Sequence, residues 1–163
     1  MPPLYWPVFW PVGNNTNKEA NRADWDNWVE VDMNTDFQRK RVLVVDDEPQ
    51  VREAIATIME FFGMEVTEAA DGVDALERFR EAEFDYVLTD HKMPRMCGDE
   101  LANQIKSIRP TQRVVMVSGY AGAVLRDGQI PSTIDALVEK PCGVNELARA
   151  LRGGLRGKLV CRS

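Results

Sequence analysis

The sequence predicts an α/β fold, built as a doubly wound parallel β-sheet with helices on both faces. From residue 41 onward, short apolar runs alternate with helix-length amphipathic segments, which is the pattern of consecutive strand–helix–strand units. The first of these runs, residues 41–45, is apolar at four consecutive positions, as expected for a strand buried on both faces of a parallel sheet. Two carboxylates, Asp46 and Asp47, follow it directly.

Five segments are predicted as strands because each is short, rich in apolar and β-branched residues, and bounded by polar or turn residues. They cover residues 41–45, 64–68, 84–89, 113–117 and 134–139. The segments between them are long enough for right-handed crossover connections.

The connecting segments carry apolar residues at helical spacing. Pro49 suits the first turn of the first helix, and Gly63 suits the position after its end. Asp71 is a good N-cap for the second helix. Glycines and a proline weaken the fourth connection, so residues 120–126 form at best a short helix, whereas residues 145–151 form the last one.

Length and composition fit one domain with extensions. Of the 163 residues, 41–154 make the domain, 1–40 an N-terminal extension and 155–163 a short C-terminal tail. A net charge of −6 argues against a general nucleic-acid surface. The three cysteines have neither disulfide nor zinc spacing, which indicates a reducing, cytoplasmic setting.

The N-terminal extension is apolar and aromatic, but prolines interrupt it, so it is too short and too broken to span a bilayer and it does not resemble a signal peptide. All four tryptophans lie in it, and Trp25, Trp28 and Val29 are at helical spacing. We expect the extension to be largely disordered. The alternative is an aromatic segment that docks on the domain or on a partner.

Polar residues follow four of the five predicted strands. Asp46 and Asp47 end the first strand, Asp90 the third, Ser118 the fourth and Lys140 the fifth. In a doubly wound sheet these residues gather at the carboxyl edge, where ligands bind. Clustered carboxylates favour a hard cation such as Mg2+, and an aspartate can accept a phosphoryl group. The set therefore predicts phosphoryl transfer to a carboxylate.

Four motifs in this order resemble the receiver domain of two-component response regulators. They are Val-Val-Asp-Asp-Glu at 44–48, Leu-Thr-Asp at 88–90 with Met-Pro at 93–94, Val-Ser-Gly at 117–119, and Glu-Lys-Pro at 139–141. The resemblance covers about residues 40 to 154. It implies a flavodoxin-like (βα)5 fold with strand order 2-1-3-4-5.

The resemblance also implies roles for particular residues. Asp90 matches the phosphoacceptor, Ser118 the switch hydroxyl and Lys140 the phosphate-contacting lysine, with a cis bond to the following proline. The matching Mg2+ ligands are Asp46, Asp47, Asp90 and the backbone carbonyl of Lys92.

The sequence departs from the family pattern in three places. Leu137 stands where the family often has a switch aromatic, and Cys142 replaces a common phenylalanine. The abbreviated fourth helix resembles receivers of hybrid histidine kinases. The only histidine, His91, lacks a partner at metal-ligand spacing and is expected to point away from the pocket.

The resemblance implies a non-enzymatic switch or phosphate shuttle. Its phosphoryl donor would be a histidine kinase or a histidine phosphotransfer protein, and its output would pass through protein contacts, with no nucleic acid or membrane as partner. No DNA-binding segment follows residue 154 in this sequence, and a homodimer is left open. Two alternatives remain: a phosphate-independent interaction module, and an aspartate-nucleophile phosphatase, whose usual Asp-x-Asp motif is absent here.

Overall fold

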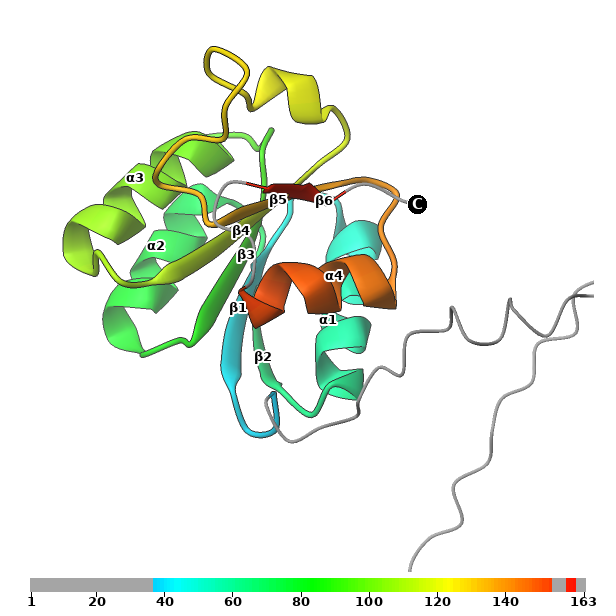
Figure 1. Cartoon of the computed structure of the whole chain (residues 1–163). Helices are drawn as coiled ribbons and strands as arrows, with labels where there is room; N and C mark the ends of the chain where they lie inside the picture. The colour runs from blue at the N-terminus through cyan, green and yellow to red at the C-terminus, as the bar shows by residue number, and fades with distance from the viewer. Residues whose placement is uncertain (1–36, 154–157, 161–163) are drawn as a thin grey trace, which may run out of the picture.

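The fold is a single parallel sheet between two helical layers (Figure 1). The structure, a computed structural model, describes residues 37–153 and 158–160. The strand order is β2-β1-β3-β4-β5-β6. The strands are β1 (Arg41–Val45), β2 (Glu65–Ala69), β3 (Tyr86–Asp90), β4 (Arg113–Ser118), β5 (Ala136–Glu139) and β6 (Lys158–Val160). The predicted order of the first five strands is confirmed. The sixth, parallel to β5, lies within the predicted tail and was not anticipated.

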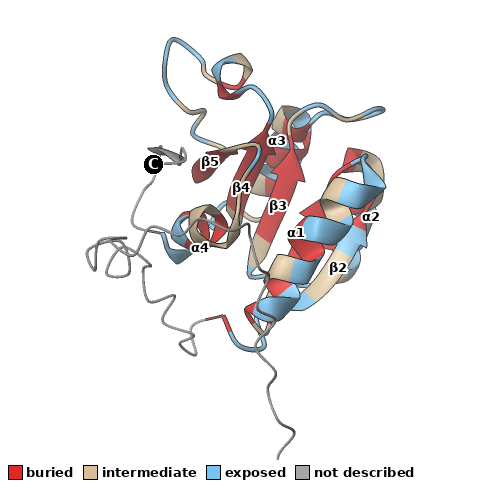
Figure 2. Cartoon of the chain, turned by 90° about the vertical axis from the view of Figure 1, so that its right-hand side faces the viewer, coloured by how far each residue is buried: buried red, intermediate tan, exposed pale blue. Residues whose placement is uncertain are grey.

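In the described part of the chain, four helices connect or follow the strands, together with one 3-10 turn. They are α1 (Pro49–Phe61), α2 (Gly72–Glu81), α3 (Gly98–Ile108), the turn η1 (Ala121–Ala123) and α4 (Val144–Arg152). Helices α1 and α4 cover one face of the sheet, and α2 and α3 cover the other (Figures 1 and 2). Between β4 and β5 only η1 forms, as the glycines and proline of that connection predict.

The core consists of two apolar layers separated by the sheet. Val42 and Val44 of β1 pack with α1 and α4, whereas Leu43 and Val45 pack with α2 and α3. Successive strand residues point to opposite faces, so a central strand needs apolar side chains at every position. Each fully buried Val or Leu contributes about 1.5–3 kcal/mol. These layers fix the carboxyl edge on which the polar residues sit.

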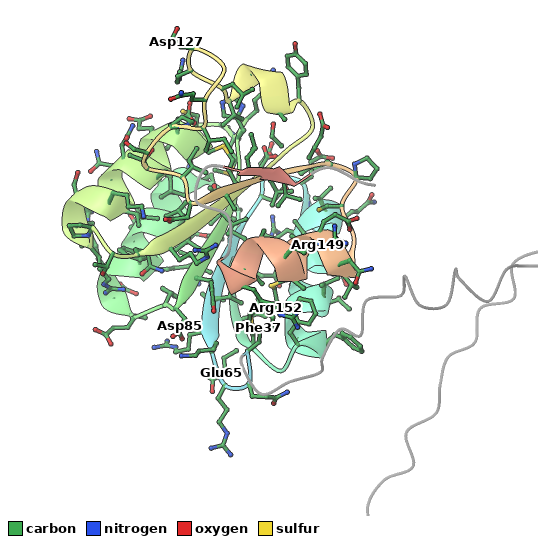
Figure 3. All side chains as sticks on the ribbon, in the orientation of Figure 1. Phe37, Glu65, Asp85, Asp127, Arg149 and Arg152 are labelled. Carbon is green, nitrogen blue, oxygen red and sulfur yellow. The ribbon has the colours of Figure 1, made fainter. Side chains whose placement is uncertain are left out.

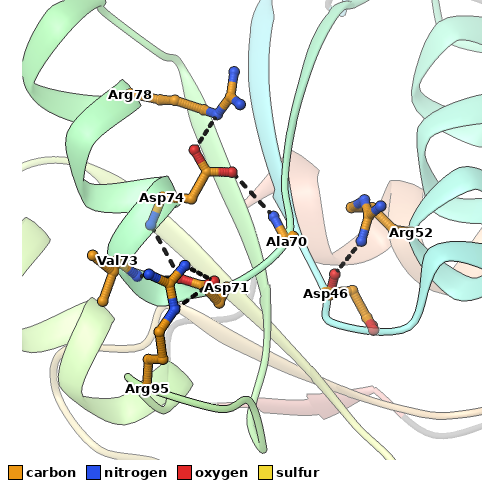
Figure 4. Close-up of polar contacts among 8 residues, drawn as sticks. All are labelled: Asp46, Arg52, Ala70, Asp71, Val73, Asp74, Arg78 and Arg95. Atoms are coloured by element: carbon orange, nitrogen blue, oxygen red, sulfur yellow. Dashed lines mark hydrogen bonds and ion pairs between the residues drawn. The ribbon is translucent and has the colours of Figure 1, made fainter.

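Helix α2 begins at a capping carboxylate that also holds a neighbouring loop. Asp71 accepts hydrogen bonds from the backbone N–H groups of Val73 (2.8 Å) and Asp74 (3.1 Å), and its other oxygen accepts from the Arg95 guanidinium (Figure 4). Burial acts to raise the pKa of Asp71, but the Arg95 and backbone hydrogen bonds outweigh it and lower that pKa. Asp71 thus joins α2 to the loop between β3 and α3.

Replacing this cap is expected to destabilise the domain. Asp71→Ala should reduce the free energy of unfolding by about 1–2 kcal/mol at pH 7, because two helix N–H groups lose their acceptor. A lowered carboxyl pKa stabilises the fold above its unfolded value of 3.8 and stops doing so as the pH falls below it. Denaturant unfolding should therefore show a gap between wild type and variant that closes below pH 3.8. Glu77→Ala, at an exposed position of the same helix, is the control. A gap of the same size at acid pH would contradict this account.

Within the described residues, no helix combines the length and the apolar composition needed to cross a bilayer.

Candidate functional site

Two buried carboxylates from adjacent strands share one ammonium group at the carboxyl edge of the sheet. Asp46 follows β1 and Asp90 ends β3, and β1 and β3 are paired neighbours. Lys140 Nζ donates to Asp46 Oδ2 and to Asp90 Oδ1, at 2.8 Å in each case. The side chain of Asp46 is 2% exposed and that of Asp90 is 10% exposed. The structure therefore brings together three of the predicted site residues.

The charge state of Lys140 follows from these contacts. Burial acts to lower its pKa, but the hydrogen bonds to Asp46 and Asp90 outweigh that effect and raise the pKa above its ordinary value of 10.5. Lys140 is therefore a cation at every physiological pH. It partly offsets the two negative charges that the fold holds side by side. The peptide bond from Lys140 to Pro141 is cis, as the sequence resemblance implied.

The backbone around Asp90 is held closely by the loop that follows it. The Lys92 N–H donates to Asp90 Oδ2 at 2.9 Å, and the Gly98 N–H donates to the carbonyl oxygen of His91 at 2.9 Å. At Gly98 a Cβ atom would overlap the backbone carbonyl oxygen of Asp90. Glycine is required there because helix α3 begins against the backbone of the candidate phosphoacceptor.

The backbone around Asp46 is held by helix α1. The Glu48 N–H donates to Asp46 Oδ1 at 2.9 Å, and Arg52 donates to the carbonyl oxygen of Asp46 at 2.6 Å (Figure 4). Arg52 also pairs with Glu68 at 3.0 Å. The role of Arg52 could not be predicted from the sequence, since no motif marks an arginine that binds a backbone carbonyl one turn into a helix.

Ser118 is buried at the end of β4, one residue beyond the position paired with Asp90. Its Oγ accepts a hydrogen bond from the Tyr120 N–H at 3.2 Å, and its carbonyl accepts one from the Lys140 N–H at 2.8 Å. The next residue, Gly119, is exposed, and a Cβ there would have open space around it. Ser118 thus lies at the same sheet edge as Asp90, linked by its backbone to Lys140.

The predicted metal ligands are only partly brought together. Asp46 and Asp90 converge on Lys140 Nζ, and the Lys92 backbone lies beside Asp90, where its N–H donates to Asp90 Oδ2, whereas the Asp47 side chain is exposed. Among the described residues, no three acidic, histidine or cysteine side chains form a group that could hold a metal ion. The donor chemistry nevertheless suits Mg2+, which prefers carboxylate and carbonyl oxygens. The Lys140 ammonium lies between the carboxylates of Asp46 and Asp90, where it supplies one positive charge.

His91 is directed to a different group from the one around Lys140. Its Nε2 lies 3.6 Å from Asp99 Oδ2 on α3, and Arg126 donates to the same oxygen at 2.9 Å. These contacts tie the loop after β3 and the β4–β5 connection to the start of α3. His91 was predicted to point away from the pocket, but its partners could not be predicted, because they come from distant segments.

The fold and this edge define a class of protein: a doubly wound α/β domain in which one lysine bridges two buried carboxylates at the carboxyl edge of the sheet. The sequence model of the response regulator receiver domain matches residues 42–152. Because this match covers more than half of the chain, the protein belongs to the response regulator receiver domain family.

Similar curated proteins include the response regulator receiver protein CpdR of Brucella abortus, 32% identical over 113 residues, which are 69% of this chain and 93% of CpdR. The gliding motility regulatory protein of Myxococcus xanthus is 34% identical, but the match spans only 15% of it. For the response regulator MprA of Mycobacterium, 32% identical, it spans 50%. This chain thus matches nearly all of one relative and a part of the others.

Solved structures show the same fold. The response regulator TrrA of Thermotoga maritima, solved in complex with Mg2+-BeF, is 30% identical, with a TM-score of 0.64 over 69% of this chain and 96% of that one. The chemotaxis response regulator CheY4 of Vibrio cholerae is 25% identical, with a TM-score of 0.63 over 71% of this chain and 98% of its own.

Proposed function

We propose that Asp90 is the phosphoacceptor of a two-component phosphorelay. A carboxylate oxygen of Asp90 attacks the phosphorus of a phosphohistidine on a histidine kinase or a histidine phosphotransfer protein. The donor's phosphorus–nitrogen bond breaks, and the released imidazole nitrogen takes up a proton. The observation that carries the proposal is the 2.8 Å contact between Lys140 Nζ and Asp90 Oδ1, which puts a permanent cation where the added phosphoryl charge would lie.

The other site residues have supporting roles in this proposal. Mg2+ would be held by Asp46, Asp47, Asp90 and the backbone carbonyl of Lys92, and it supplies charge neutralisation at the phosphoryl oxygens. Ser118 would donate its hydroxyl hydrogen to a phosphoryl oxygen. Its Oγ also accepts a hydrogen bond from the Tyr120 N–H, directly before η1, so a shift of Ser118 would be passed to the surface around η1. Protein contacts there would carry a switch or shuttle function.

The thiols support a proposal about the cellular setting. Cys97 and Cys142 are both free. Free thiols and reversible protein contacts suit the reducing cytoplasm, where we place this domain.

Phosphorylation by a small acyl phosphate tests the proposal without a partner protein. Intact mass should show one added phosphoryl group on the wild type in the presence of Mg2+, and none on Asp90→Asn. Chelation of Mg2+ should suppress the reaction. An unmodified wild type that also fails to bind Mg2+ would favour the phosphate-independent module. Continuous release of phosphate with no lasting adduct would favour the phosphatase.

The phosphoryl group is expected to be long-lived. Lys92 and Tyr120 are large, exposed residues on the loops after β3 and β4. In this proposal their side chains limit the approach of water to the phosphoryl group. Alanine at both positions should make hydrolysis of the aspartyl phosphate several-fold faster, measured by loss of the mass adduct after the donor is removed. Glu100→Ala, an exposed position on α3, is the control. Equal lifetimes for wild type and the double variant would refute the shielding role.

A further inference from the structure

An apolar groove of about 440 Å3 lies between α1 and the segment after β5. Its lining comes from one face of α1 and from the start of the β5–α4 loop: Gln50, Val51, Ala54, Ile55, Ile58, Lys140, Pro141 and Cys142. One end is therefore next to Lys140 and the candidate phosphoacceptor. The volume of the groove is in the range typical of ligand-binding clefts.

The first described residue is anchored close to the other end of this groove. The Phe37 side chain is buried, with its ring 5.3 Å from that of Phe62 and 6.1 Å from that of Tyr86. Phe62 follows Ile58 by one helical turn, on the same face of the helix. The preceding chain therefore leaves the domain about one turn of α1 from the groove.

The composition of the segment before Phe37 is complementary to the surface of the domain near Phe37. Residues 24–36 carry five carboxylates and no lysine or arginine, together with Trp25, Trp28 and three further large apolar residues. Near the exit point, α4 ends with two exposed arginines, Arg149 and Arg152, and the Arg152 guanidinium lies 5.8 Å from the Phe37 ring centroid (Figure 3). The acidic residues of this segment are thus complementary in charge to Arg149 and Arg152, and its aromatic residues suit the apolar groove.

The length of the segment is sufficient to reach the whole groove. From Phe62 to Gln50 along α1 is about 18 Å at 1.5 Å per residue. Thirteen residues span about 20 Å as a helix and about 43 Å when extended. No linker beyond residues 24–36 is needed.

We propose that residues 24–36 dock in this groove, with the tryptophans on its apolar lining and the carboxylates toward Arg149 and Arg152. The N-terminal extension is then an intramolecular ligand that covers α1 up to Lys140. A protein that reaches Asp90 across this face of α1 has to displace it. This proposal does not depend on phosphoryl transfer, and its tests use the unphosphorylated full chain.

Tryptophan fluorescence tests the docking directly, because residues 37–163 contain no tryptophan. In a full chain with Trp6→Phe and Trp10→Phe, all emission comes from Trp25 and Trp28. It should be blue-shifted and protected from quenching by acrylamide.

Ala54→Glu puts a charge into the groove at an exposed position and should shift the emission to that of solvated indole, with several-fold stronger quenching. Thr57→Glu, exposed on α1 but outside the groove, should leave it unchanged. Emission of solvated indole in the parent chain, or no response to Ala54→Glu, would overturn the proposal.

Alkylation of the groove's own thiol gives an independent test. With Cys97→Ser and Cys161→Ser, only Cys142 reacts with N-ethylmaleimide. Replacing Trp25 and Trp28 by Ser should raise its alkylation rate several-fold, whereas replacing Trp6 and Trp10 by Ser should not. Equal rates in all three chains would show that the groove is open in the isolated protein and available to a partner, and would overturn intramolecular docking.

Discussion

Lys140→Met is expected to slow phosphorylation by a small acyl phosphate at least about tenfold. It should also lower the free energy of unfolding by about 2–4 kcal/mol in Mg2+-free buffer. The reason is that Asp46 and Asp90, both largely buried, share the Lys140 ammonium as a common hydrogen-bond donor. Without the ammonium, two adjacent buried carboxylates lose their compensating charge, and in a low-dielectric site this lowers the stability of the folded state. Methionine keeps the apolar length of the side chain, so the loss is one of charge.

The pH dependence of this stability difference has a definite sign. The folded-state pKa of Lys140 is raised above 10.5, so its contribution is complete below that pH and fades only as the pH rises beyond it. The gap in unfolding free energy between wild type and Lys140→Met should therefore be constant from pH 6 to pH 9.

Lys106→Met is the matched control. Lys106 Nζ pairs with the buried Asp135 at 2.8 Å, away from the site, so its loss should also destabilise the domain but leave the phosphorylation rate unchanged. A wild-type phosphorylation rate in Lys140→Met would contradict the role given to this lysine.

Gly98→Ala is expected to destabilise the domain by about 3 kcal/mol or more, a large effect for a single methyl group. A Cβ at this position meets the backbone carbonyl oxygen of Asp90, and backbone cannot rotate away as a side chain would. The loop after β3 has to move, which displaces the Lys92 N–H from Asp90 Oδ2. Denaturant unfolding should show the loss of stability, and the acyl phosphate reaction should slow in parallel.

Gly119→Ala provides the comparison for this prediction. It also lies in a loop at the carboxyl edge, but a Cβ there meets nothing within 4 Å. We expect its unfolding free energy to stay within about 0.5 kcal/mol of wild type. If Gly98→Ala is as stable as Gly119→Ala, the close approach of α3 to Asp90 does not exist in solution.

The elements of the fold that could be predicted are those marked by a residue pattern within their own segment. The bounds of β1 agree with the predicted segment because four buried residues are followed at once by two carboxylates. The weak helix between β4 and β5 follows from its glycines and proline, which act on the backbone directly. By contrast, β6 is only three residues long, too short for a strand pattern to be recognised, so its pairing with β5 depends on a sheet edge that sequence patterns do not describe.

The site was predictable as a set of positions but not as a set of contacts. Parallel strands bring their carboxyl ends to one edge, which placed Asp46, Asp90, Ser118 and Lys140 together. That Lys140 reaches across to both carboxylates depends on the length and path of its side chain. The ion pair between Asp71 and Arg95 joins residues 24 positions apart on two loops. No sequence spacing predicts either of these contacts.

Locating the phosphoryl group in the chain is the most direct test of the role proposed for Asp90. After reaction with an acyl phosphate and Mg2+, borohydride reduces an aspartyl phosphate to the corresponding alcohol and releases phosphate. Peptide mass spectrometry then identifies the modified residue. We expect homoserine at Asp90 and an unmodified aspartate at Asp46 and Asp47. A modification at Asp47, or an Asp90 that remains unreduced while the chain carries phosphate elsewhere, would contradict that role.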